Sequence, residues 1–234
     1  MRNYIILNGV SSTTITGLLI QNLPPISKPR IRVDVEEING RDGDIVTPLG
    51  YGAYDKEFKI GLSGDFDIDA IISYFNSQGT VTFSNEEDKY YNYQIIEQIN
   101  FNRLIRYREA TVKMHIQPFK YSATDNQKVF TIDNETSIDI RNAGNIYSRP
   151  VVTITGTGNI ELYLNNIQLF SINMGDYTSI TIDTNNMNAY NGTALLNRNV
   201  IGNYDNFKLN VGKNTISWTG DITEIEIDNY SRWI

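Results

Sequence analysis

The sequence predicts a mainly β protein built from two domains. Apolar and polar residues alternate with a period of two in many short segments, whereas only one segment has the apolar spacing of a helix. A Pro followed by small and polar residues interrupts this alternation between Pro118 and Asn126, which is typical of a link between domains. We therefore expect an N-terminal β-sandwich or β-barrel domain with one α-helix in residues 1–124 and a C-terminal β-sandwich in residues 125–234. The 234 residues, 40% of them hydrophobic, are sufficient for two small domains.

Two segments of the first half show the alternation most clearly. Their apolar residues are Phe58, Ile60 and Leu62 in one segment, and Val112, Met114 and Ile116 in the other. The residues between them are polar or Gly. Each segment is therefore expected to be a half-buried strand.

The helical segment lies between Asp67 and Gly79. Large apolar residues recur there at positions i, i+3, i+4 and i+7, namely Ile68, Ile71, Ile72 and Phe75. Asp67 is suited to be the N-cap, and Gly79 can adopt the left-handed conformation that ends a helix. We expect one amphipathic helix at this place.

The second half contains shorter alternating segments separated by Gly or by Asn pairs. Several short strands at regular spacing predict a β-sandwich. Gly156-Thr157-Gly158 joins two such segments and is not followed by a helix, so a hairpin turn explains it better than a dinucleotide-binding loop does. The clearest segments are Val151–Ile154, Ile160–Leu164, Ser179–Ile182 and Glu224–Ile227.

Charge and composition disfavour several classes of function. The formal net charge of −7 opposes stable binding to nucleic acid, since polyanions would be repelled. Cys is absent, which removes disulfides, thiolate nucleophiles and Cys-based zinc sites. Neither a signal peptide nor a bilayer-spanning stretch is evident, so we expect an aqueous setting without a membrane.

No metal or cofactor site is expected from the motifs. The first part of a calcium-binding loop has the pattern D-x-D-x-D, which Asp65, Asp67 and Asp69 match. However, Ala70 is at the position that requires Gly, and Asn76 is at the position that requires a bidentate Glu. The start of a helix is the better interpretation of these carboxylates.

No catalytic residue is expected either. Glu86, Glu87 and Asp88 are paired carboxylates in principle, but no His or apolar pocket is evident nearby to shift their pKa values, so we expect a solvated loop. His115 is the only His and lies on the polar face of its predicted strand. A Ser-His-Asp triad would also need a nucleophile elbow, and the sequence contains none. A glycosidase would need two carboxylates opposed across a cleft.

Aromatic residues suggest a binding surface. With 15 Tyr and many Asn, a carbohydrate-binding β-sandwich for host cell-wall saccharide is an alternative function, because rings stack on sugars while amides bond hydroxyl groups. Trp218 alternates with Ile216, however, which predicts that its ring lies in the core. Among Tyr90, Tyr91 and Tyr93, neighbouring rings point to opposite faces of a strand, so we expect some of them at an interface with a partner.

The segment Asn39-Gly40-Arg41-Asp42-Gly43 lies between two predicted strands. Its Asn-Gly and Asp-Gly pairs favour positive φ and a tight turn. Because a guanidinium pairs well with carboxylates, Arg41 and Asp42 are candidate contacts with a neighbouring subunit.

Taken in order along the chain, several stretches resemble the distal tail protein (Dit) family of long-tailed phages. The resemblance runs from end to end and is weakest between Phe170 and Asn206. The stretches that carry it are Val33–Val35 with Asn39–Asp44, Ile68–Asn76 with Gly79–Ser84, Asp88–Ile95, Glu109–Tyr121, Asn142–Asn145, Arg149–Val152 and Leu209–Trp218.

This resemblance implies a structural protein of the phage virion. It implies an N-terminal domain related to tail-tube folds, whose copies form a hexameric ring, and a galectin-like C-terminal β-sandwich outside the ring. In the family this hub lies at the distal tail tip and joins the tail tube to tail-tip or baseplate proteins, including the tail-associated lysin and sometimes receptor-binding proteins. It further implies no enzymatic activity, assembly in the host cytoplasm, and a ring through which DNA passes without being held.

Overall fold

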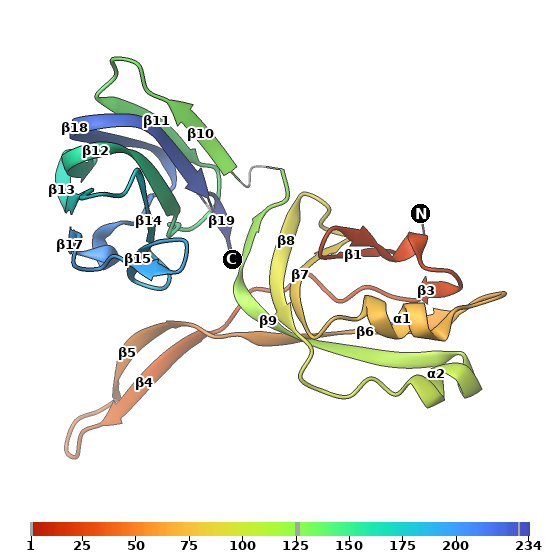
Figure 1. The fold of residues 1–234 in the computed structure, drawn as a ribbon. Helices are drawn as coiled ribbons and strands as arrows, with labels where there is room; N and C mark the ends of the chain where they lie inside the picture. Colours follow the sequence, from red (N-terminus) through yellow and green to blue (C-terminus); the bar gives the residue numbers. More distant parts are fainter. Residues whose placement is uncertain (1, 125–126, 229) are drawn as a thin grey trace. The chain divides into compact units, whose positions relative to one another are not determined.

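The computed structural model describes residues 2–124, 127–228 and 230–234. The chain divides into two compact units, one comprising Met1–Ala123 with Ile234 and the other comprising Thr124–Trp233. Strands dominate both units (Figure 1). The prediction of a mainly β protein with a β-sandwich architecture is confirmed.

The first unit is a curled antiparallel sheet with two short helices. Its strands follow one another in the order β2-β1-β7-β8-β9-β6-β3. The strands are β1 (Ile5–Leu7), β2 (Val10–Ser11), β3 (Leu18–Ile20), β6 (Tyr54–Leu62), β7 (Gln78–Phe83), β8 (Lys89–Gln94) and β9 (Glu109–Ser122). The two helices are α1 (Ile68–Tyr74) and α2 (Phe101–Tyr107), and a 3₁₀ turn, η1 (Ser12–Thr14), lies between β2 and β3.

The core of this unit forms along the β6–β9 ladder. Phe58 lies opposite Val112 in that ladder, and both side chains are buried, as their alternation predicts. Phe83 of β7 packs edge-on against both Phe58 and Tyr91, with ring centroids 6.1 and 5.8 Å apart. Leu104 of α2 is also buried in this core. Aromatic and aliphatic side chains from strands distant in sequence therefore close the sheet around one apolar centre.

The two helices partly agree with the sequence. Asp67 caps α1 as predicted, because its Oδ1 accepts hydrogen bonds from the backbone N–H groups of Asp69 and Ala70 at 3.1 and 3.0 Å. The helix ends at Tyr74, however, and Gly79 lies in β7 with a φ of 147°. The second helix, α2, was not expected, so the prediction of a single helix is wrong.

A separate two-stranded ribbon leaves the sheet between β3 and β6. It consists of β4 (Ile31–Glu37) and β5 (Asp44–Tyr51), which pair with each other and, in the described part of the chain, with no other strand. In Figure 1 it extends from the start of β6 as a long hairpin. We call residues 31–51 the arm.

The second unit is a β-sandwich whose layers share two long strands. Those strands are β12 (Val151–Leu164) and β18 (Gly212–Asp228), which pair along most of their length. The other elements are β10 (Gln127–Thr131), β11 (Ser137–Asn142), β13 (Ile167–Asn173), β14 (Ser179–Asp183), β15 (Asn188–Asn191), β16 (Ala194–Leu195), β17 (Val200–Gly202), η2 (Tyr204–Asn206) and β19 (Arg232–Trp233).

Both long strands bend where the β12–β18 register shifts. On one side of the shift, β12 pairs with β14, and on the other side it pairs with β13. Gly156-Thr157-Gly158 lies at this bend, so the prediction of a hairpin turn there is wrong. At Gly156 a Cβ would lie 2.2 Å from the carbonyl oxygen of Asp221, and this close backbone approach is why the bend needs Gly.

Strand β9 continues through most of the segment expected to link the domains. It includes Pro118 and ends at Ser122. Part of the expected link, residues 125–126, lies outside the described residues. The residues directly after Pro118 therefore belong to the last part of strand β9 and not to a linker.

Candidate functional site

The arm is the most unusual surface of the chain. Every residue of β4 and all but the last of β5 are exposed. Gly40 and Gly43 have positive φ angles of 84° and 78° and close the tip, as the sequence predicts. An isolated two-stranded ribbon is marginally stable in water, so the arm is a candidate for contact with another surface.

The two faces of the arm differ in polarity. In an antiparallel pair, opposite residues share a face, so Val33 lies beside Pro48 and Val35 beside Val46. The exposed fractions of Val35 and Val46 are 49% and 55%. Asp34 and Thr47 lie on the reverse face. This apolar stripe is therefore a candidate site of interaction.

Arg41 and Asp42 lie at the tip of the arm, in the turn that the sequence predicts. The backbone N–H of Arg41 donates to the carbonyl of Ile38 at 3.1 Å, which stabilises the turn. Within the described residues, neither Arg41 nor Asp42 forms an ion pair. Both charged groups are therefore available to a partner, and their role at an interface remains our proposal.

The tyrosines of β8 are placed differently from the expectation. Tyr91 and Tyr93 are buried, with exposed fractions of 0% and 2%, because residues two apart on this strand both face the core. The expectation that these two rings line an interface is thereby corrected. Tyr90 lies on the opposite face and stacks on Tyr121 with ring centroids 5.5 Å apart.

A buried polar cluster lies beside the segment that leads to the arm. Glu86, expected in a solvated loop, instead accepts hydrogen bonds from the buried ammonium of Lys120 at 2.7 Å and from the hydroxyl of Tyr91. The Nζ of Lys56, also buried, donates to the carbonyl of Pro25 at 2.6 Å.

Burial lowers the pKa of Lys56 to about 8, an effect that the carboxylate of Glu86 partly offsets and the ammonium of Lys120 reinforces. Beside this cluster, Asn85 donates to the carbonyl of Pro24 at 3.1 Å. Together these bonds attach the chain before the arm to the sheet.

The single His lies in a surface ion-pair network. The Nδ1 of His115 lies 2.8 Å from Asp55, whose other oxygen lies 3.2 Å from Lys113. The hydrogen bond from His115 is the main reason that the pKa of Asp55 is lowered. Lys113 also pairs with Glu97 at 2.6 Å. This arrangement links β6, β9 and the chain before α2 across an exposed face.

The residues that the structure describes contain no group of three or more His, Cys, Asp or Glu side chains placed to hold a metal ion. Among the same residues, no helix is sufficiently long and apolar to traverse a bilayer.

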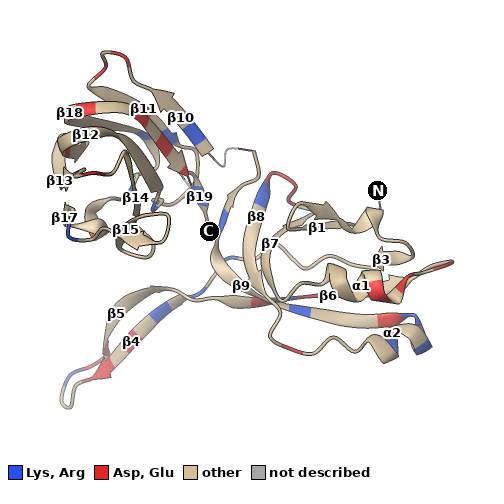
Figure 2. Ribbon diagram, viewed as in Figure 1, with Lys and Arg blue, Asp and Glu red and all other residues tan. Residues whose placement is uncertain are grey.

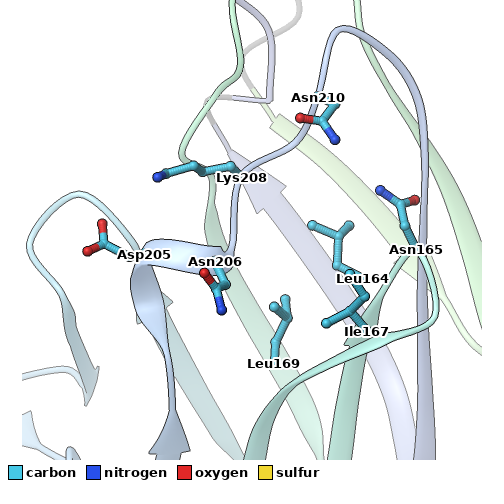
Figure 3. A pocket seen from close by; sticks show the side chains of 8 residues that line it. All are labelled: Leu164, Asn165, Ile167, Leu169, Asp205, Asn206, Lys208 and Asn210. Carbon is cyan, nitrogen blue, oxygen red and sulfur yellow. The ribbon is translucent and has the colours of Figure 1, made fainter. Parts of the chain in front are cut away.

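The second unit has an open pocket of about 420 Å³. As Figure 3 shows, aliphatic side chains of β12 and β13 face polar side chains from the segment that includes η2. Asp205, at its edge, pairs with Arg149 at 2.6 Å, and this hydrogen bond lowers the pKa of Asp205. The lining residues are Leu164, Asn165, Ile167, Leu169, Asp205, Asn206, Lys208 and Asn210.

This pocket lacks the ring platform on which a sugar would stack. None of its eight lining residues is aromatic. Trp218 is only 4% exposed, and the prediction that it lies in the core is confirmed. Within the described residues, the side-chain amides of Asn206 and Asn210 make no hydrogen bond, so the pocket offers free polar groups without an aromatic ring for stacking.

Sequence reasoning missed two features, the exposed apolar face of the arm and the helix α2. The alternation in β4 was visible, but alternation alone does not say whether an apolar face meets the core or a partner. The helix α2 had one usable signal, Asn100, whose side chain accepts a hydrogen bond from the N–H of Arg103 at 2.8 Å and caps the helix.

Comparison with known proteins gives similarity in structure alone. No family model matches the sequence, and no curated protein matches it. A solved structure of the Dit protein of phage SPP1, described as a paradigm of the hub of the adsorption apparatus in phages infecting Gram-positive bacteria, is similar over 100% of both chains, with a TM-score of 0.65 and 15% identity.

Two structures of the phage P2 baseplate in its activated conformation are also similar. The one with calcium has a TM-score of 0.54 and 11% identity, and it covers 100% of this chain and 98% of the other. The one with strontium has a TM-score of 0.52 and 12% identity over 97% of each chain. Both units of this chain, in their order, therefore have the fold of a Dit-like phage baseplate hub protein.

Proposed function

We propose that this chain is a structural subunit of a phage tail that assembles into a ring at the distal tip. The ring is a hexamer that joins the tail tube to the tail-tip or baseplate proteins. The match with the SPP1 Dit hub protein over the full length of both chains supports this assignment. Two baseplate structures with the same fold support it further.

The observation that carries the proposal is the uncovered apolar face of the arm. A protein that worked alone would expose the stripe around Val35 and Val46 to water at a cost of about 25 cal/mol for each Å². Copies arranged around an axis can bury such a stripe repeatedly through a head-to-tail contact. Arg41 and Asp42 at the arm tip, with Tyr90 of β8, are candidate residues of this interface.

The partners and location follow from the same role. The tail-tube protein would bind one side of the ring, and the tail-associated lysin, with receptor-binding proteins in some phages, the other. The protein would reside in the virion at the tail tip after assembly in the host cytoplasm. It would act without a cofactor and make or break no bond, and its net charge of −7 would let DNA pass without stable binding.

Native mass spectrometry and negative-stain images of the purified chain test the ring. We expect a closed hexamer for the wild-type chain. The change Val46→Asp places a charge on the apolar face and should yield monomers, whereas Thr47→Lys places a charge on the reverse face, opposite Asp34, and should leave the ring intact. A wild-type chain that stays monomeric, or a ring that tolerates Val46→Asp, would contradict the proposal.

The alternative function, binding of host cell-wall saccharide, has weaker support. Only the free amides of Asn206 and Asn210 in the second unit favour it. Titration of the chain with cell-wall saccharide, followed by amide chemical shifts, separates the two functions. A monomer whose shifts change around this pocket would favour the saccharide-binding module over the hub.

A further inference from the structure

The first unit has an apolar groove beside its helices. The groove has a volume of about 340 Å³ and lies between α1 and the chain that enters α2. Ile72, on its α1 side, is 44% exposed. Its lining residues are Ile72, Phe75, Ser77, Ile95, Glu97, Gln98, Ile99 and Phe101.

The helix that borders the groove also carries arginines. Phe101, which lines the groove, is the first residue of α2, and Arg103, Arg106 and Arg108 follow it within seven positions. All three are exposed, and Figure 2 shows Lys and Arg positions in blue at α2. The guanidinium groups of Arg103 and Arg106 lie over the ring of Tyr107, at 5.8 and 5.3 Å from its centroid.

Within the described residues, the arginines of this patch form no ion pair with a carboxylate, although Glu109 lines one small pocket together with Arg103. Among the ion pairs formed by the described residues, none includes Arg103, Arg106 or Arg108. Glu109, the nearest carboxylate in sequence, pairs with Lys59 at 3.1 Å. Among the described residues of this acidic chain, three arginines without a carboxylate partner therefore lie on or directly after the helix that borders the groove.

The arm carries the complementary pattern. Its apolar pair Val35 and Val46 is followed, towards the tip and on the same face, by Glu37 directly opposite Asp44. Like charges opposed across a ribbon destabilise it, and within the described residues neither carboxylate has a cationic partner. The arm thus presents an apolar stripe that ends in two carboxylates, and the groove is an apolar surface bordered by a helix that carries arginines.

The two surfaces lie at opposite ends of one ladder. The arm joins the end of β6 where Tyr54 pairs with Ile116, whereas α2 joins β9 at the other end, where Gly61 pairs with Glu109. At about 3.3 Å per residue the intervening ladder is roughly 23 Å long. Two different complementary patches at opposite ends of a subunit are what a head-to-tail contact between copies requires.

We propose that the arm of one copy docks in the groove between α1 and α2 of the next copy, with Glu37 and Asp44 against Arg103 and Arg106. This contact rests on the proposed ring and specifies which surfaces form it. The apolar stripe supplies the buried area, and the charges set the direction and register of docking.

Charge reversal in two variants tests the contact. One variant, Glu37→Lys with Asp44→Lys, has a basic arm, and the other, Arg103→Glu with Arg106→Glu, has an acidic patch. Each alone should lose the ring, because arm and patch would then carry the same sign. Mixed together, they should form a ring in which the two variants alternate, three copies of each, identified by its mass in native mass spectrometry.

A third variant with all four changes should form a ring alone. The matched control, Arg141→Glu with Arg198→Glu, removes two exposed arginines of the second unit and should leave the wild-type ring unchanged. Thermal unfolding of every variant, measured by circular dichroism, confirms that the subunits are folded.

The results distinguish this contact from the ring itself. A wild-type chain without a ring contradicts the proposed function. A wild-type ring that persists after either charge reversal overturns the arm–groove contact alone. Loss of the ring in both variants without recovery in the mixture also overturns it, because the charges would then not face each other.

Discussion

At the scale of single residues, glycines at the bend of the second unit show how closely two backbones approach. Gly220 of β18 has a φ of 98°, and a Cβ there would lie 2.3 Å from the carbonyl oxygen of Asn159. Gly212 has a similar φ of 92°, but a Cβ there would meet nothing within 4 Å. Comparing substitutions at these two glycines therefore separates the free-energy cost of the left-handed backbone conformation from the cost of steric overlap.

We predict that Gly220→Ala destabilises the protein more than Gly212→Ala. The left-handed conformation alone costs a non-Gly residue about 1–2 kcal/mol. The overlap at Gly220 should add about 1–3 kcal/mol, since neither backbone can move freely in a paired ladder. Unfolding in urea measures both variants, and equal losses of stability would show that the bend relaxes without cost.

Lys56 gives a second residue-scale prediction, for pH. Its folded-state pKa of about 8 lies below the ordinary 10.5, so the unfolded chain binds more protons between these values. The free energy of unfolding should therefore rise with pH above about 8, until the tyrosines oppose it above pH 10, where burial raises the pKa of Tyr54 to about 12.

The change Lys56→Met should remove this rise in stability. Urea unfolding between about pH 8 and pH 10 compares the variant with the wild type. Lys59→Met, at a position whose side chain is 52% exposed, is the matched control and should keep the rise. A wild-type stability that stays flat in this pH range would contradict the role given to Lys56.

At the scale of elements, the arm contacts the sheet that carries it through the ring of Tyr51, which packs edge-on against Phe119 of β9 with centroids 5.6 Å apart. Its two strands form no ladder with any other strand in the described residues. We predict that replacing residues 31–51 with a short Gly-Ser linker leaves the monomer folded but unable to form a ring. Circular dichroism and native mass spectrometry measure the two effects, and loss of folded structure would show that the arm supports the sheet.

Secondary structure could be predicted from the sequence where it depends on neighbouring residues alone. The alternation around Phe58 and Val112 predicted two strands, and Asp67 predicted the start of α1 because its cap depends only on nearby N–H groups. The bend at Gly156 was missed because Gly marks both turns and close approaches, and only the distant Asp221 decides between them. Helix α2 was missed because Leu104 is its only buried residue.

The candidate site could be predicted only in part for a related reason. The turn at Arg41 and Asp42 follows from its Asn-Gly and Asp-Gly pairs. The faces of Val35 and Tyr91 show the same alternation, yet one is exposed and the other is buried. Period-two alternation reveals that two faces differ, and what covers each face depends on the rest of the fold.

At the scale of the whole molecule, each unit has its own apolar core. The core of the first unit includes Ile116, that of the second includes Ile154, and no buried residue of either cluster comes from the other unit. The described residues of each unit therefore have the apolar interior that an independent domain needs.

We predict that the chain unfolds in two steps that respond to different substitutions. Ile116→Ala and Ile154→Ala each remove a fully buried side chain and should destabilise one unit by about 2–5 kcal/mol. Scanning calorimetry should show that each change lowers the midpoint of a different transition. A single transition shifted by both variants would instead indicate that the units unfold as one.

The shared strands of the second unit also determine how it would respond to mechanical load. Because β12 and β18 each run through both layers, neither layer can slide away without breaking the ladder that joins these two strands. A pull along β12 would load its hydrogen bonds to β18 in shear, all at once, instead of peeling them one by one. We therefore expect the β12–β18 ladder to be the part of this unit that resists a pull along its strands most strongly.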